Sequence, residues 1–208
     1  MNKDLFTDSI AARLGLCVAA ALMSANAAFA QSAGIEGSPK GANNSSAESI
    51  RLYMQMHAVL SHPRCVNCHP RDDTPKQGLD GHVHSPPITR GPHDNGPPGL
   101  PCMTCHNDAN FDPGRVPGAP NWHLAPASMA WEGKTPAELC RAMTDRSKNG
   151  NRDLQATVKH LTGDTLVAWG WEPGIDVYGN PRQPVPLPKA EFNSIVTAWA
   201  KTGGSCPE

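Results

Sequence analysis

The runs that decide this fold are Cys65-Val66-Asn67-Cys68-His69 and Cys102-Met103-Thr104-Cys105-His106. In both, two thiols stand three positions apart and a histidine follows the second one directly. This Cys-x-x-Cys-His pattern is the attachment signature of c-type haem, in which the thiols bond to the porphyrin and the imidazole binds the iron. The sequence therefore predicts two covalently bound haems, one at Cys65, Cys68 and His69 and one at Cys102, Cys105 and His106.

Two other uses of paired cysteines compete with haem. Four thiols could close a tetrahedral zinc shell, but zinc chemistry does not require a histidine directly after each pair. The cysteines could instead form a disulfide framework, yet pairs separated by only two residues are poor cross-links between distant segments. Haem attachment explains the pairs and the histidines together.

The first thirty residues resemble a secretory signal peptide. Lys3 and Arg13 give a charged start, an apolar run extends from Leu14 to Met23, and Ala28-Phe29-Ala30 has the small-x-small form of a cleavage site. We expect residues 1–30 to be the signal peptide and residues 31–44 to be a flexible linker rich in Gly, Ser, Asn and Ala. The domain that carries the haems is then 45–208, and its predicted location is the periplasm.

Composition indicates a core organised by cofactors. Aromatic residues make up only 5% of the chain, whereas it contains 19 glycines and 21 prolines. Side chains alone would give a thin core, which two porphyrins would fill. The formal net charge is −1, and no basic run indicates nucleic acid as a partner. No segment is apolar over the length of a transmembrane anchor.

Local signals predict helices separated by long loops. Ser45-Ser46-Ala47-Glu48 has the form of a capping box, with Ile50, Tyr53, Met54 and His57 following at helical spacing. Further helices are predicted after Thr135, over Arg152–Leu161 and over Lys189–Thr202. Residues 70–101 and 107–126 are broken by Pro, Gly and Asp and are expected to wrap the haems as loops. The predicted fold class is mostly α with long irregular loops, similar to a multihaem cytochrome c.

Each haem iron has a second axial position, and the ligand there strongly affects its potential. Of the nine histidines, seven remain besides His69 and His106. We favour His84, held by the rigid Pro86-Pro87, and His160, on the predicted third helix, as distal ligands. A solvated loop histidine and a helix-surface histidine are the ordinary alternatives for these two. The competing ligands are His82, His123, Met129 and His62.

Cys140 and Cys206 are left over once the haem thiols and Cys17, which lies in the predicted signal peptide, are assigned. In an oxidising compartment a spare pair most often forms a disulfide, and two buried free thiols are the alternative. The tryptophans Trp122, Trp131, Trp169 and Trp171 are expected to pack the haem pockets or the core rather than to relay electrons.

Three stretches extend the comparison beyond the haem motifs: residues 62–70, residues 118–126 and the run Asp164-Thr165-Leu166-Val167-Ala168-Trp169. On these stretches the chain resembles a family of small exported dihaem c-type cytochromes often labelled isoquinoline 1-oxidoreductase subunit. The resemblance implies association with a molybdenum hydroxylase. The chain itself lacks the Cys-x4-Cys-x2-Cys iron–sulfur ligands of such an enzyme, so it is expected only to take electrons from one.

The sequence thus predicts an electron carrier, not an enzyme. We expect a periplasmic dihaem cytochrome that passes electrons between an exported dehydrogenase and a downstream acceptor, with redox proteins as its partners. The alternatives are a small dihaem peroxidase, which needs one open iron position, and a haem-bearing sensor or subunit of a larger complex.

Overall fold

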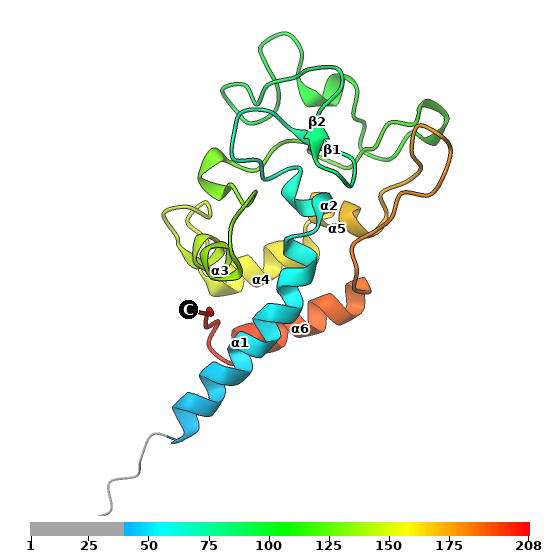
Figure 1. The fold of residues 1–208 in the computed structure, drawn as a ribbon. Coiled ribbons are helices and arrows are strands. Elements are labelled where there is room, and N and C mark those ends of the chain that lie inside the picture. The colour runs from blue at the N-terminus through cyan, green and yellow to red at the C-terminus, as the bar shows by residue number, and fades with distance from the viewer. Residues whose placement is uncertain (1–39) are drawn as a thin grey trace, which may run out of the picture. The chain divides into compact units, whose positions relative to one another are not determined.

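The computed structural model describes residues 40–208, and Figure 1 shows their course. The predicted signal peptide and residues 31–39 of the predicted linker lie outside the described residues. The helices are α1 (Lys40–Leu60), α2 (Pro63–Val66), α3 (Pro136–Thr144), α4 (Leu154–Gly163), α5 (Thr165–Ala168) and α6 (Lys189–Lys201). Single 3₁₀ turns occur at η1 (Cys102–Thr104), η2 (Asp112–Gly114), η3 (Ala127–Met129) and η4 (Trp169–Trp171). The predicted class, mostly α with long irregular loops, is confirmed.

The start of α1 differs from the prediction. The helix begins at Lys40, so residues 40–44 are helical and not part of a linker. The prediction that residues 45–48 form a capping box at the start of this helix is therefore wrong. Ser45 instead donates from its Oγ to the carbonyl of Thr202 at 3.0 Å, and Glu48 pairs with Arg51. Ser45 therefore lies inside the helix and contacts the chain end that follows α6, so it is not the N-cap.

The helical core lies where α1 and α4 pack against α6. Tyr53 and Met56 of α1 are fully buried, as is Trp199 of α6. Of the residues predicted for the buried face of α1, Tyr53 is buried, Ile50 and His57 are half-buried, and Met54 is exposed, so the prediction is wrong at Met54. On α6 the predicted apolar stripe is confirmed, because its buried residues are Phe192, Ile195, Val196 and Trp199. Within residues 40–208, no helix is long and apolar enough to cross a membrane.

Two local predictions in the last third of the chain are confirmed. Thr135 caps α3 with a complete capping box to Glu138. Asp153 caps α4 by accepting from the backbone N–H of Ala156, one residue inside the predicted start. Cys140 of α3 and Cys206 form a disulfide with a Cα–Cα distance of 5.6 Å. The bond ties α3 to the chain end that follows α6.

Residues 70–126 contain little regular structure and gather at one end of the helical part (Figure 1). A short antiparallel ladder, which the sequence did not predict, pairs β1 (Lys76–Gln77) with β2 (His82–Val83). Buried Arg90 supports the loops by donating to the carbonyl of Asp72 and pairing with Asp94 at 2.8 Å. The first Cys-x-x-Cys-His motif ends directly before this irregular region, and the second lies within it.

Candidate functional site

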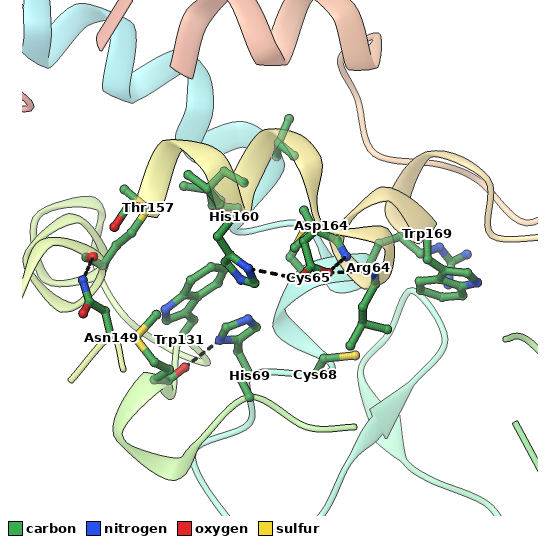
Figure 2. A pocket seen from close by; sticks show the side chains of 18 of the residues that line it. Arg64, Cys65, Cys68, His69, Trp131, Asn149, Thr157, His160, Asp164 and Trp169 are labelled. Atoms are coloured by element: carbon green, nitrogen blue, oxygen red, sulfur yellow. Dashed lines mark hydrogen bonds and ion pairs between the residues drawn. The ribbon is translucent and has the colours of Figure 1, made fainter. Parts of the chain in front are cut away.

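The first motif forms one wall of a cavity in the described part of the chain. About 1060 Å³ of space free of atoms lies inside it, the open solvent at its mouth included. Cys65, Cys68 and His69 line it together with His160 of α4 (Figure 2). The short helix α2 presents Cys65, and Pro63 at its start suits the first turn of a helix.

His69 is held so that one ring nitrogen stays free. Its Nδ1 lies 2.7 Å from the carbonyl oxygen of Met129 and donates to it in the neutral tautomer. The ring stacks on Trp131, with centroids 3.6 Å apart and planes within 10°. Burial lowers the pKa of His69 to about 4, so the imidazole is neutral at pH 7. Its Nε2 makes no hydrogen bond to the described residues, which is the state that a metal-binding histidine requires.

The thiols of the first motif are protonated and unbonded. Burial raises the pKa of Cys65 to about 12 and that of Cys68 to about 11. None of the four motif cysteines forms a disulfide. The disulfide framework considered from the sequence is therefore not what these residues form.

The second motif repeats this arrangement on a shorter loop. The Nδ1 of His106 lies 2.7 Å from the carbonyl oxygen of Pro117, and its ring stacks on Trp122 with centroids 4.6 Å apart. His106 is 9% exposed, whereas Cys105 is exposed. Burial lowers the pKa of His106 below its usual range. This site is more open to solvent on its thiol side than the first.

Each motif histidine has a second histidine nearby. The rings of His84 and His106 have centroids 5.9 Å apart, close to the roughly 6 Å expected when two imidazoles bind one metal ion through bonds of about 2 Å. The Nδ1 of His84 lies 2.9 Å from the carbonyl oxygen of Pro86, so its Nε2 is free. The predicted role of Pro86 in fixing this histidine thus takes the form of a hydrogen bond.

At the first site, His160 and His123 both line the cavity of His69. His160 has its Nδ1 3.3 Å from Asp164 Oδ2, the kind of carboxylate contact that orients metal-binding imidazoles. His123 is exposed and contacts the carbonyl oxygen of Asn121 through its Nδ1. His160 is the better-positioned partner, because a helix and a carboxylate fix its ring.

The remaining competitors have other partners. His82 uses both ring nitrogens, one for Asp80 at 2.6 Å and the other for Gln77 at 3.0 Å. His62 accepts the backbone N–H of Arg64 at its Nδ1 and caps α2. Met129 is buried in the core, and its carbonyl holds His69 on the side of the ring opposite Nε2. His84 and His160 are therefore better placed than these three residues to act as the second ligand opposite a motif histidine.

The two sites are neighbours. Trp169 lines the first cavity and packs edge-on against Trp122, with ring centroids 5.0 Å apart. Trp122 in turn stacks on His106. Cys102 lies near enough to Cys68 to contribute to the raised pKa of that thiol, after burial. One tryptophan pair thus connects the first cavity with the ring of the second motif.

The donor groups fit haem better than a closed metal shell. Within residues 40–208, no three His, Cys, Asp or Glu side chains come together as a closed metal shell would need. Haem iron needs only two protein ligands, since the porphyrin supplies the others. His69 with His160 and His106 with His84 are the pairs that could supply them.

Sequence reasoning missed the groups that hold these histidines. The carbonyls of Met129 and Pro117 have no sequence signature, because any residue supplies one. It also missed Arg64, which is 9% exposed, lines the cavity and makes no ion pair within residues 40–208. The sequence signal that could have identified Arg64 is its position directly before Cys65, the first cysteine of a haem motif. Comparison of the chain with protein-family models, curated proteins and solved structures finds no match.

Proposed function

We propose that this chain is an exported dihaem c-type cytochrome that carries electrons between redox proteins. The observation that carries the proposal is the shared state of the two motif histidines. Both have Nδ1 held by a carbonyl at 2.7 Å, both stack on a tryptophan, and both keep Nε2 free beside two unbonded thiols. When bound, haem iron accepts and releases one electron by alternating between its ferric and ferrous states.

The chain's own residues would do three things for such a cofactor. His69 and His106 would hold the iron from one side, and the carbonyls behind them would fix the rings and raise their basicity. The core residues around the first cavity would keep water from that site. His160 and His84 would close the opposite iron positions, which favours electron transfer over ligand chemistry.

The same histidine pairs argue for a carrier over a peroxidase. A peroxidase needs one iron position left open for peroxide, whereas each motif here has a second histidine with a free Nε2 nearby. Contact between the two sites through Trp122 and Trp169 also suits a carrier, because electron transfer between haems requires short separations. An exported dehydrogenase of the molybdenum hydroxylase class is the donor that the family resemblance adds to this proposal.

The test is the intact mass of protein made in a host that matures c-type haem. We expect the cleaved chain plus two haems. The double variant Cys65→Ala/Cys68→Ala and the double variant Cys102→Ala/Cys105→Ala should each lose one haem. Cys140→Ala/Cys206→Ala is the matched control and should keep both. A wild-type mass with no haem, or with zinc instead, overturns the proposal.

A further inference from the structure

Two residues that line the first cavity carry a buried hydrogen-bond donor without a partner. Among the described residues, Trp131 Nε1 and Thr157 Oγ1 are buried and make no hydrogen bond. Trp131 is 6% exposed and Thr157 is 4% exposed, and both line the cavity. A buried donor left unpaired destabilises the fold, so a bound group that accepts from both would be stabilised there.

Two other tryptophans of the cavity and four other threonines of the described chain do have hydrogen-bond partners. Trp169 and Trp171 line the same cavity, yet their indole N–H groups donate to Asn110 at 3.0 Å and to the carbonyl of Leu187 at 2.7 Å. Four other threonines, in a helix or directly after one, donate from the hydroxyl to the carbonyl four residues earlier: Thr144, Thr162, Thr197 and Thr202. Among these five, only the hydroxyl of Thr157 makes no such bond.

The charge around the cavity favours an anion. Arg64 and Arg152 line it, and neither forms an ion pair within residues 40–208. The only acidic side chain in the lining is Asp164, which lies against His160. Arg152 donates to the carbonyl of Asn149 at 2.6 Å and holds its guanidinium at this wall.

The donors lie at the end of the cavity away from the thiols. In Figure 2, Thr157, Asn149 and Trp131 occupy one side of the view and Cys65 and Cys68 the other, with His69 and His160 between them. Haem carries its vinyl groups and its two propionates on different edges of the porphyrin. A haem joined to Cys65 and Cys68 through its vinyl groups would direct its propionates to the other end.

We propose that Trp131, Thr157 and Arg152 form the carboxylate-binding end of the first cavity and receive a propionate of its haem. This inference rests on the proposed function and adds the residues that fix the ionised carboxylate. Trp131 and Thr157 donate one hydrogen bond each, and Arg152 supplies the countercharge. An uncompensated propionate charge stabilises ferric haem relative to ferrous haem. By compensating that charge, the three residues would raise the potential of the first haem.

The test compares Thr157→Val, which removes the hydroxyl at nearly equal volume, with Thr157→Ser, which keeps it. Thr162→Val on the same helix is the control, because its hydroxyl bonds only the carbonyl of Val158. Thr157→Val and Trp131→Phe should each shift one of the two midpoint potentials to a more negative value. They should also move the propionate band in the redox-difference infrared spectrum. Thr157→Ser and Thr162→Val should match the wild type in both measurements.

A second readout does not depend on the potential. In the reduced holoprotein the indole N–H of Trp131 should exchange slowly with solvent deuterium, as measured by ¹⁵N NMR, and Thr157→Val should leave it protected. Mass spectrometry on every variant should find two haems, which separates this inference from the proposed function. Two haems with unmoved potentials and infrared bands would show that water satisfies these donors and would overturn the inference. Zero haems in the wild type would instead defeat the proposed function.

Discussion

The imidazole of His106 lies parallel to the indole of Trp122, with ring centroids 4.6 Å apart and planes within 12°. His69 and Trp131 repeat this relationship at 3.6 Å and 10°. Both tryptophans and both carbonyls that hold the histidines come from one stretch, residues 117–131. A single irregular segment therefore fixes the motif histidines of both sites, although the motifs themselves are far apart in sequence.

We predict that both haems are low-spin in both redox states and bind little carbon monoxide. The reason is that His84 and His160 each bring a free Nε2 to the neighbourhood of a motif histidine. Electron paramagnetic resonance of the oxidised protein and optical spectra of the reduced protein measure the spin states. A native high-spin haem that reacts rapidly with peroxide would favour the peroxidase alternative.

The two distal ligands can be assigned separately. His84→Ala should remove the low-spin signal of the second haem only, and His160→Ala that of the first only. His82→Ala is the control at the second site, since both of its ring nitrogens have other partners. His123→Ala is the control at the first site and should keep a low-spin spectrum. A low-spin signal lost in His123→Ala but kept in His160→Ala would assign the first ligand to His123.

Loss of the disulfide should lower stability without removing haem. The bond between Cys140 and Cys206 closes a loop with a sequence separation of 66, for which chain-entropy arguments give roughly 4 kcal/mol. We expect Cys206→Ser to lower the free energy of unfolding by up to about that amount, with two haems retained by mass. Adding Cys140→Ala should cost much less than the first substitution, because the cross-link is already gone. Equal, additive losses would mean that the cross-link contributes little.

The elements that sequence predicted best are those set by local chemistry. Thr135, Pro136 and Glu138 satisfy the N-terminal donors of α3 within four residues, so the cap is visible without tertiary information. The stripe on α6 was equally visible, because its apolar residues repeat at helical spacing. Cys140 and Cys206 were paired by elimination, and the structure confirms that pairing.

The elements that sequence missed depend on contacts between distant residues. The local capping signal did not mark the start of α1. Ser45 and Ser49 lie inside the helix and donate to the carbonyls of Thr202 and Trp199, at least 150 residues away in sequence. The bond between His69 and Met129 spans 60 residues through a loop without periodicity. Trp131 was expected to pack a haem pocket or the core. That its indole N–H has no hydrogen-bond partner can be seen only from the folded structure around it.

The last prediction concerns His62, which precedes the first motif and caps its short helix. The ring accepts the backbone N–H of Arg64 at Nδ1, 3.2 Å away, and only an unprotonated Nδ1 can accept. Burial, and then the charge of Arg64, lowers the pKa of His62 below its ordinary 6.5. Between the folded and unfolded pKa values the unfolded chain binds more protons. Stability therefore rises with pH in that window and is lost as the pH falls from about 6.5 through the folded pKa.

Asparagine can cap a helix without titrating, so His62→Asn isolates this contribution. At pH 8 we expect the variant and the wild type to unfold at similar denaturant concentrations, whereas His62→Ala should lose about 1 kcal/mol. At pH 5 the Asn variant should be the more stable of the two. His93→Asn is the matched control, because His93 is exposed on a loop, and it should leave the pH profile unchanged. If His62→Asn followed the wild-type profile from pH 8 to pH 5, His62 would not be the titrating cap.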